Sequence, residues 1–437
     1  MNFPSMGVLM NEKLEEKIRN YEHVWESVWS SASTSIREAS DPSLDWILKD
    51  IKKRNASIIA SVPCGDFTNE KFLADQGIQV EGYDISKTAL AKAREKCPGA
   101  VLTNHNILHG KLPRSYDIII AIDFSMHLTN QSLLDFFDNI YLSLKELGVL
   151  YLNFLSPEDD TAQTNQVNQD NIALLKNDSI LIKYRTRDEI EEIVKKTGFR
   201  IVDVLPYERK DGPHKSLTGT QQEHTHRGYS MALKKDFSSV EEAIEQIKQG
   251  KLIIIKDHRE DEGDFFIPSE KATPDSVNFM LQYGRGVLCV SMLPERFQEL
   301  GIKTAREMGI NKNEARFGES IDYIVGTTTG SSAYDRSATI RAVAEKTVLP
   351  VNFRRNGHLR TLEADIGGIK SREGHTEASI ELARLAGLYP SGVIIEILER
   401  GGLMAPEDNL INLSREYKIP IIKIGQLLRY KEKLYGQ

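Results

Sequence analysis

The stretch Arg259-Glu260-Asp261-Glu262-Gly263-Asp264 decides how the second half of this chain is interpreted. It places four carboxylates in five positions and directly follows residues 252–255, an apolar run of buried-strand length. Carboxylates packed this closely repel one another, so on a glycine-containing loop at the end of a strand they indicate a cation site. An acidic run by itself is also typical of a solvated turn. Motifs elsewhere in the chain have to separate the two interpretations.

Two further clusters precede predicted helices. In Arg372-Glu373-Gly374-His375-Thr376-Glu377, the glycine allows close backbone approach to a ligand, and Thr376 is predicted as the N-cap of a helix over residues 376–386. Free N–H groups there would attract a phosphate, and Arg372 would add a clamp. The hydroxyl-rich run of residues 326–336 precedes a predicted helix over residues 333–344. Each cluster alone is equally explained by ordinary capping or turn chemistry.

Taken together and in order, these motifs resemble the 3,4-dihydroxy-2-butanone 4-phosphate synthase family. The similarity covers about 200 residues, nearly the whole second half. The matching motifs are residues 259–264, Glu270–Pro274, Asn278–Met280, Gly284–Gly286 with Cys289, Thr328–Arg336, Gly374–Ala378 and Gly392–Glu396.

The resemblance implies a magnesium-dependent enzyme, active as a homodimer, that converts D-ribulose 5-phosphate into 3,4-dihydroxy-2-butanone 4-phosphate and formate. Glu260 and His375 would hold Mg²⁺ or Mn²⁺. Catalytic roles would fall to His358, Glu396, Asp264 and Glu262. Substrate contacts would come from Arg259, Glu260, Asp264, Thr329, Arg372, Glu373, Gly374, His375 and Thr376.

These residue types suit the implied reaction. The ketose must lose protons beside its carbonyl, and a metal stabilises the resulting enediolate. A histidine and carboxylates can move protons near neutral pH. The chain departs from the family pattern at Leu359-Arg360-Thr361-Leu362 after Gly357-His358, at residues 316–322 and at Ser331. Because these positions flank the substrate pocket, a different phosphorylated ketose is an alternative substrate.

The first half alternates short apolar runs with helical patterns, which predicts right-handed crossovers and a parallel α/β sheet. We expect residues 207–223 to form a loop and residues 228–233 to close the sheet as an edge strand. Lys234-Lys235-Asp236 is the expected linker. The chain would then divide into an N-terminal Rossmann-like domain, residues 1–235, and a C-terminal α/β domain, residues 236–437.

The first half resembles class I S-adenosylmethionine-dependent methyltransferases. Gly65 follows the strand predicted over residues 57–62, and Asp84 ends the next strand. The resemblance implies that Gly65, Asp84, Asn106 and Asp123 bind S-adenosylmethionine. The glycine loop is degenerate, since Pro63 and Phe67 stand where glycines are usual and Ser61 where an acid is usual. A methyltransferase-like scaffold that no longer binds cofactor is the alternative.

The segment His224-Thr225-His226-Arg227 is expected in a polar loop at the edge of this sheet. Metal binding is one interpretation of its two histidines. Simple surface exposure, or contact with a substrate, is favoured over it.

The bulk composition excludes several classes of function. A net charge of -7 provides no general attraction to nucleic acid or to an anionic membrane. Three cysteines form no disulfide framework and no zinc pattern, which indicates a reducing, cytoplasmic compartment. The N-terminus does not have the pattern of a signal peptide, and no apolar run is long enough to span a bilayer.

The sequence therefore predicts a bifunctional enzyme. The second half would make 3,4-dihydroxy-2-butanone 4-phosphate, and the first half would methylate that product or a metabolite derived from it. The methyl acceptor is unknown. The alternatives are a monofunctional synthase with a non-catalytic methyltransferase-like module, or a second half that rearranges a different phosphorylated ketose.

Overall fold

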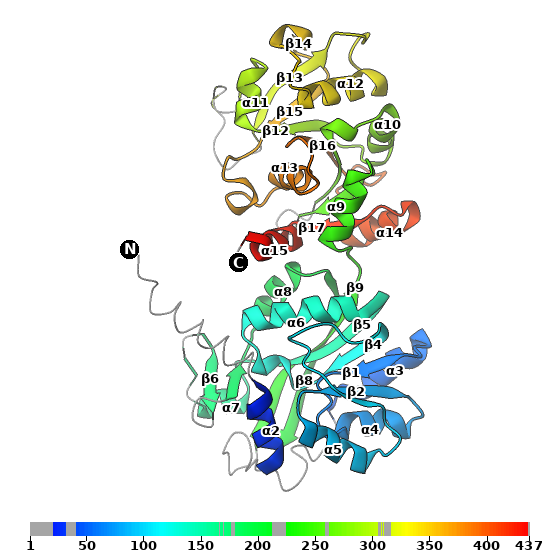
Figure 1. Cartoon of the computed structure of the whole chain (residues 1–437), viewed down its shortest axis with the longest axis vertical. Coiled ribbons are helices and arrows are strands. Elements are labelled where there is room, and N and C mark those ends of the chain that lie inside the picture. The colour runs from blue at the N-terminus through cyan, green and yellow to red at the C-terminus, as the bar shows by residue number, and fades with distance from the viewer. Residues whose placement is uncertain are drawn as a thin grey trace. The chain divides into compact units, whose positions relative to one another are not determined.

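The structure is a computed structural model that describes residues 21–31, 41–165, 167–168, 170–175, 180–211, 224–257, 262–304, 307, 309 and 316–435. The chain forms two compact units, Met1–Asp236 and Phe237–Gln437. Both are mixtures of helices and sheet, as the α/β prediction requires (Figure 1). No helix among these residues is both long and apolar enough to cross a membrane.

The first unit is built on a seven-stranded sheet in the order β3-β2-β1-β4-β5-β9-β8. Strands β3 to β5 pair in parallel, whereas β9 runs antiparallel to both of its neighbours. Its described elements are α2 (Tyr21–Ser31), α3 (Leu44–Arg54), β1 (Ile59–Ser61), α4 (Thr68–Asp75), β2 (Val80–Asp84), α5 (Lys87–Lys96), β3 (Leu102–Asn104), β4 (Tyr116–Ala121), η1 (Ser125–His127), α6 (Asn130–Ser143), β5 (Leu144–Leu155), α7 (Asp160–Thr164), β6 (Ile172–Leu175), β7 (Ile180–Lys183), α8 (Arg187–Lys195), β8 (Phe199–Asp211) and β9 (His224–Lys235).

Apolar side chains cover both faces of this sheet because successive residues of a strand point to opposite sides. Ile118 and Ile120 pack with residues of α3, α4 and α5 on one face. Ile119 and Leu150 pack with residues of α6 and α8 on the other. Burial on both faces is the reason that these central strands read as continuous apolar runs.

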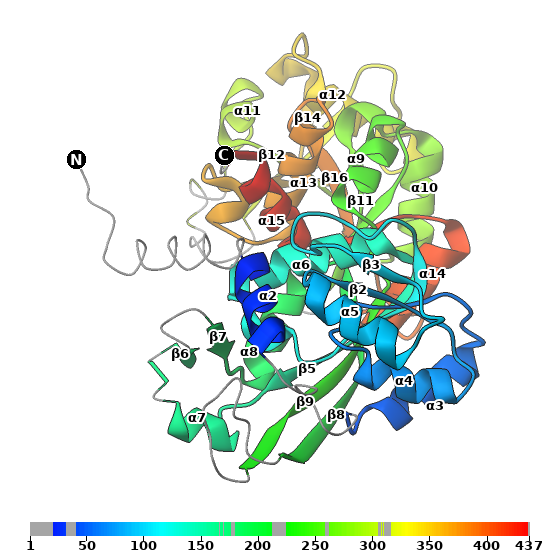
Figure 2. The ribbon, with the colours of Figure 1, turned by 60° about the horizontal axis from the view of Figure 1, so that its bottom comes forward.

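The prediction for the last strand was wrong in position. Residues 228–233 do not form the edge, because β9 lies between β5 and β8 and leaves β8 at the edge. Figure 2 shows β8 and β9 side by side as a long two-stranded ribbon.

The polar segments near that strand were also assigned wrongly. Residues 207–211 belong to β8 and residues 224–227 to β9, while residues 212–223 lie outside the described part of the chain. The expected linker residues Lys234 and Lys235 are likewise part of β9. Polar side chains suggested loops, but the two backbones satisfy each other's hydrogen bonds and extend the pairing.

The second unit holds a mixed eight-stranded sheet in the order β14-β13-β15-β12-β16-β11-β10-β17. Helices α9, α13 and α15 pack on one face, and α10, α12 and α14 pack on the other. Its elements are α9 (Val240–Lys248), β10 (Ile253–Lys256), β11 (Gly263–Pro268), η2 (Ser269–Lys271), α10 (Pro274–Tyr283), β12 (Cys289–Met292), α11 (Pro294–Glu299), β13 (Phe317–Tyr323), α12 (Ala333–Ala344), η3 (Pro350–Asn352), β14 (Phe353–Arg355), β15 (Leu359–Glu363), η4 (Gly368–Lys370), α13 (His375–Leu385), β16 (Gly392–Glu396), α14 (Glu407–Tyr417), β17 (Ile421–Lys423) and α15 (Ile424–Tyr435).

Candidate active sites

Three side chains of the second unit form a cluster that suits a cation. Ligand atoms of Glu262, Asp264 and His375 lie within 4.8 Å of one another. Nε2 of His375 is 3.9 Å from Oδ1 of Asp264 and 3.2 Å from the carbonyl oxygen of Ile255. Two carboxylates and one imidazole form a donor set that fits Mg²⁺ or Mn²⁺ better than Zn²⁺.

The local structure of this cluster differs in two details from the prediction. Asp264 lies in strand β11 and not in a loop, because Gly263 and Asp264 pair with Lys256 and Ile255 of β10. Thr376 is not the N-cap of α13: Gly374 holds that position and His375 begins the helix. Thr376 is instead buried inside the first turn.

Strand register brings the other predicted catalytic residues to the same end of the sheet. Asp264 at the start of β11 is directly opposite Glu396 at the end of β16. Strand β16 runs antiparallel to β12, which runs parallel to β15, so His358, just before β15, lies at this end too. Three strand spacings separate β15 from β11, roughly 14 Å. His358 and the cation cluster therefore share one end of the sheet on different strands.

His358 has a partner that the sequence reasoning missed. Its Nδ1 lies 2.9 Å from Oδ2 of Asp322, and its backbone N–H donates to Oδ1 at 2.8 Å. Asp322 is buried, while 44% of the His358 side chain is exposed. A carboxylate that holds one imidazole nitrogen leaves the other nitrogen directed outward for proton transfer. Asp322 stands in the segment that departs from the family pattern, which concealed its role.

Glu396 is fixed by the backbone around Gly286. Its Oε2 accepts a hydrogen bond from the Val287 N–H at 2.7 Å. A Cβ on Gly286 would lie 2.4 Å from the same oxygen, so glycine is required for this approach. The carboxylate is thereby held at the sheet end beside the Asp264 strand.

The predicted phosphate-binding residues are only partly described. One terminal nitrogen of Arg372 contacts both carboxylate oxygens of Glu377, at 3.2 and 3.1 Å. Thr329 is exposed and its hydroxyl lies 3.2 Å from that of Ser331. Glu373 precedes the α13 N-cap. Arg259 and Glu260 lie outside the described residues, so their predicted substrate and metal contacts stay predictions.

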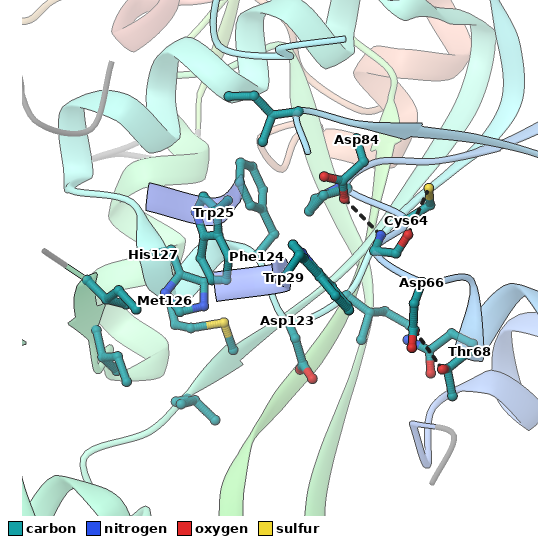
Figure 3. Close-up of a pocket in the computed structure, with 18 of the residues that line it drawn as sticks. Trp25, Trp29, Cys64, Asp66, Thr68, Asp84, Asp123, Phe124, Met126 and His127 are labelled. Carbon is teal, nitrogen blue, oxygen red and sulfur yellow. Dashed lines mark hydrogen bonds between the residues drawn. The ribbon is translucent and has the colours of Figure 1, made fainter. Parts of the chain in front are cut away.

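The first unit holds a cavity at the carboxyl ends of β1, β2 and β4 (Figure 3). The chain leaves β1 toward β2 and β3 on one side and continues with β4 and β5 on the other, so this is the switch point where such sheets bind ligands. Gly65, Asp84 and Asp123 line the cavity, as predicted cofactor contacts should. Asn106 is not among the lining residues; its side chain accepts from the Leu108 N–H within a turn.

Two residues of the glycine loop, Gly65 and Phe67, adopt positive φ. Phe67, which stands where glycine is usual, adopts φ +66°, a conformation that favours glycine. Gly65 has φ +52°, and a Cβ there would lie 3.1 Å from the Trp29 ring. Its N–H donates to Oδ2 of Asp84 at 2.8 Å.

Asp84 is buried at the end of β2. Burial raises its pKa to about 6. Hydrogen bonds from the backbone N–H groups of Ser86 and Gly65 lower the pKa, but by less than burial raises it. Because both groups donate, the ionised carboxylate is the form that the loop supports.

Arg209 of β8 and Asp123, which follows β4, form a polar wall of the cavity. A guanidinium nitrogen of Arg209 lies 3.0 Å from Oδ2 of Asp123 and 3.4 Å from Oδ2 of Asp41. Asn153 exchanges hydrogen bonds with the backbone and side chain of Asp123, both at 2.6 Å. The sequence reasoning named Asp123 but missed Arg209 and Asp41, which are distant in the chain.

An apolar wall completes the cavity. It comes from α2, from η1 and the residue before it, from the end of β5 and from the β6–β7 hairpin. The sequence reasoning also missed this two-stranded hairpin. Its side chains are Trp25, Trp29, Phe124, Met126, Leu155, Leu175, Ile180 and Ile182.

Family models match both halves of the chain. Residues 241–430 match the model described as 3,4-dihydroxy-2-butanone 4-phosphate synthase, and residues 51–204 match a methyltransferase domain. The chain joins a 3,4-dihydroxy-2-butanone 4-phosphate synthase domain to a methyltransferase domain.

Individual proteins resemble one half each. The riboflavin biosynthesis protein RibBA of Endomicrobium trichonymphae is 44% identical over 201 residues, which cover 46% of this chain and 50% of that protein. A solved 3,4-dihydroxy-2-butanone 4-phosphate synthase in complex with two magnesium ions is 31% identical and aligns with 45% of this chain and 98% of its own, with a TM-score of 0.42. A solved S-adenosylmethionine-dependent methyltransferase from Clostridium acetobutylicum is 14% identical and aligns with 49% of this chain and 98% of its own, with a TM-score of 0.34.

The chain spans about half the length of the curated relatives that it matches. The matched half is the synthase domain; the methyltransferase domain occupies the rest of this chain.

Proposed function

We propose that the synthase domain converts D-ribulose 5-phosphate into 3,4-dihydroxy-2-butanone 4-phosphate and formate. The observation that carries this proposal is the cluster of Glu262, Asp264 and His375 at the sheet end that also holds Glu396 and His358. Mg²⁺ or Mn²⁺ bound there would stabilise the enediolate that forms when the ketose loses a proton. Glu260 is a further predicted ligand.

The residues of the chain supply the remaining tasks. His358, oriented by the carboxylate of Asp322, takes up and returns protons through its exposed nitrogen. Glu396 offers a second carboxylate for proton transfer on the neighbouring strand. The first turn of α13, with the preceding residues Arg372, Glu373 and Gly374, provides N–H groups and a cation for the phosphate. Arg259 and Thr329 are further predicted contacts, and the domain would act as a homodimer.

The decisive assay incubates the protein with D-ribulose 5-phosphate and Mg²⁺ and measures formate and the four-carbon phosphate by mass spectrometry. Formate together with that phosphate supports the synthase. A folded, metal-replete protein that releases no formate would contradict it. In that case the departures at Leu359 and Ser331 favour another phosphorylated ketose as substrate, and other ketose phosphates become the next substrates to assay.

The methyltransferase domain would transfer a methyl group from S-adenosylmethionine to the synthase product or to a metabolite derived from it. The hydrogen bond from Gly65 to Asp84 at the switch point supports cofactor binding. Many methyl transfers need only proximity and in-line geometry, so a dedicated base is not required. A non-catalytic module is the second candidate, favoured by the Trp29 ring, which covers the loop at Gly65.

Tryptophan fluorescence separates these two candidates. All three tryptophans, Trp25, Trp29 and Trp46, belong to the first unit, and two of them line the cavity. Saturable quenching by S-adenosylmethionine, lost in Asp84→Ala, supports methyl transfer. A signal that stays unchanged, with no heat of binding at millimolar cofactor, supports the non-catalytic module.

A further inference from the structure

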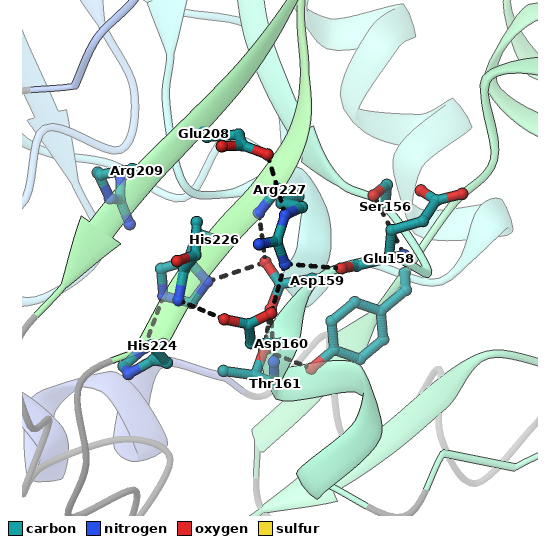
Figure 4. A network of polar contacts seen from close by, with 12 residues as sticks. Ser156, Glu158, Asp159, Asp160, Thr161, Glu208, Arg209, His224, His226 and Arg227 are labelled. Atoms are coloured by element: carbon teal, nitrogen blue, oxygen red, sulfur yellow. Dashed lines mark hydrogen bonds and ion pairs between the residues drawn. The ribbon is translucent and has the colours of Figure 1, made fainter.

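Two histidines of β9, His224 and His226, lie together in a network of polar contacts (Figure 4). His224 and His226 alternate with Thr225, so their side chains point to the same face of the strand. Both are buried, with 9% and 7% of their surface exposed, and His226 lines the cavity. The expectation of surface exposure for this segment was therefore wrong.

The imidazole nitrogens of the two residues converge. Their Nε2 atoms are 3.2 Å apart, and their ring centroids are 4.7 Å apart with an interplanar angle of 89°. This separation allows an Nε2···Nε2 hydrogen bond between the two rings. Two nitrogens that share a tetrahedral metal at 2.0–2.1 Å are about 3.3 Å apart, close to the separation found here.

The remaining nitrogen of His226 is held by a carboxylate. Nδ1 of His226 lies 3.0 Å from Oδ2 of Asp159, which also accepts the Arg227 N–H at 2.9 Å. Its other oxygen accepts the Thr161 N–H at 2.9 Å. Asp159 accepts these hydrogen bonds, so Nδ1 of His226 carries a hydrogen and Nε2 is the ring nitrogen that faces His224. A carboxylate on the far nitrogen is the arrangement that orients metal-binding histidines.

Because His226 lines the cavity, a metal bound to its Nε2 would lie at the cavity wall. Arg209 of β8 is the cross-strand partner of His226, and it reaches Asp123 across the polar wall. His224 and His226 supply two imidazole ligands at this point.

We propose that His224 and His226, oriented through Asp159, bind a divalent transition metal in the methyltransferase cavity. Imidazole ligands favour Zn²⁺, Co²⁺, Ni²⁺ or Fe²⁺ over Mg²⁺, which separates this site from the carboxylate-rich cluster of the synthase domain. A metal with open positions would take an acceptor that offers a coordinating oxygen, and would lower the pKa of its hydroxyl. This last role depends on the methyl transfer proposed above; the metal site does not.

The test is a Co²⁺ titration of the metal-free full-length protein, with excess Mg²⁺ present and the visible absorption of bound Co²⁺ as the readout. His224→Gln and His226→Gln should each weaken binding by more than about tenfold, and Asp159→Asn by about 10- to 100-fold. His105→Gln is the matched control, because His105 contacts the Gly110 carbonyl outside the cavity. Co²⁺ affinity that neither β9 substitution changes would overturn the proposal.

A second measurement does not depend on the folding of the β9 variants. In His375→Ala protein, which lacks the imidazole of the other cluster, Cu²⁺ electron paramagnetic resonance should show two coordinating nitrogens. A spectrum with no nitrogen coupling would contradict the site. Because neither experiment uses S-adenosylmethionine, failure of methyl transfer and failure of the metal site give different results.

Discussion

Nδ1 of His358 lies 2.9 Å from a buried carboxylate oxygen of Asp322, and the second oxygen accepts the His358 backbone N–H. The carboxylate thus sets both the tautomer and the direction of the ring. The two residues are on neighbouring segments of the sheet, since Ile321 of β13 pairs with Leu359 of β15. The proton transfer proposed for His358 would depend on this pairing.

Asp322→Asn should lower the kcat for formate release by roughly 100-fold while leaving substrate affinity nearly unchanged, because general acid–base catalysis contributes that order of rate. Steady-state kinetics with D-ribulose 5-phosphate check this. Asp275→Asn, at an exposed position of α10, is the control and should behave as wild type. Equal kcat in both variants would remove Asp322 from the mechanism.

Gly357→Ala should strongly reduce formate release from D-ribulose 5-phosphate. A Cβ at Gly357 would lie 2.2 Å from the Ile321 carbonyl carbon, so the strand segment carrying His358 must move away from Asp322. Gly401→Ala is a matched control, since a Cβ there meets nothing within 4 Å. Formate release and the near-ultraviolet circular dichroism of the two variants are compared. Full activity in Gly357→Ala would show that the loop tolerates displacement.

Removal of the cation should abolish formate release and lower the unfolding temperature of the synthase domain, because Glu262 and Asp264 then repel each other without compensation. Added Mg²⁺ should restore both. His375→Ala should weaken Mg²⁺ binding by more than about tenfold, because loss of even an outer-shell partner of a metal site typically costs that much affinity. The measurements are an activity assay and a thermal melt after chelation. Full activity in chelator would contradict the site.

The buried carboxylate of Asp84 predicts a pH dependence in the methyltransferase domain. Its pKa is raised to about 6 in the folded state, above the usual 3.8. The folded state therefore binds the proton more tightly than the unfolded state, and the resulting stabilisation is complete below about pH 4 and lost as the pH rises to about 6. The free-energy change is on the order of 3 kcal/mol.

Thermal melts followed by tryptophan fluorescence test this sign. As the pH rises from about 4 to about 6, the unfolding temperature of the wild type should fall relative to that of Asp84→Asn. The affinity for S-adenosylmethionine should rise over the same range, because the ionised form accepts more hydrogen bonds. A difference that does not change with pH would mean that Asp84 titrates elsewhere.

Local sequence determined many elements of this protein. The helix over residues 333–344 was predicted with the bounds that the structure has, and its N-cap Ser332 accepts a hydrogen bond from the Asp335 N–H three residues on. The acidic run of residues 260–264 indicated a cation site, but the expected ligands were Glu260 and His375, whereas Glu262 and Asp264 were expected in catalytic roles. Such signals depend on neighbours within one turn or one loop.

Only the tertiary structure decided the pairings between distant segments. The insertion of β9 between β5 and β8, the Asp322–His358 contact and the convergence of His224 with His226 against Asp159 depend on strand order, register and packing. A polar strand that faces a cavity has the same composition as a solvated loop, so its sequence could not distinguish the two. Backbone pairing with β8 distinguishes them, because it satisfies the hydrogen bonds of residues 224–227 without water.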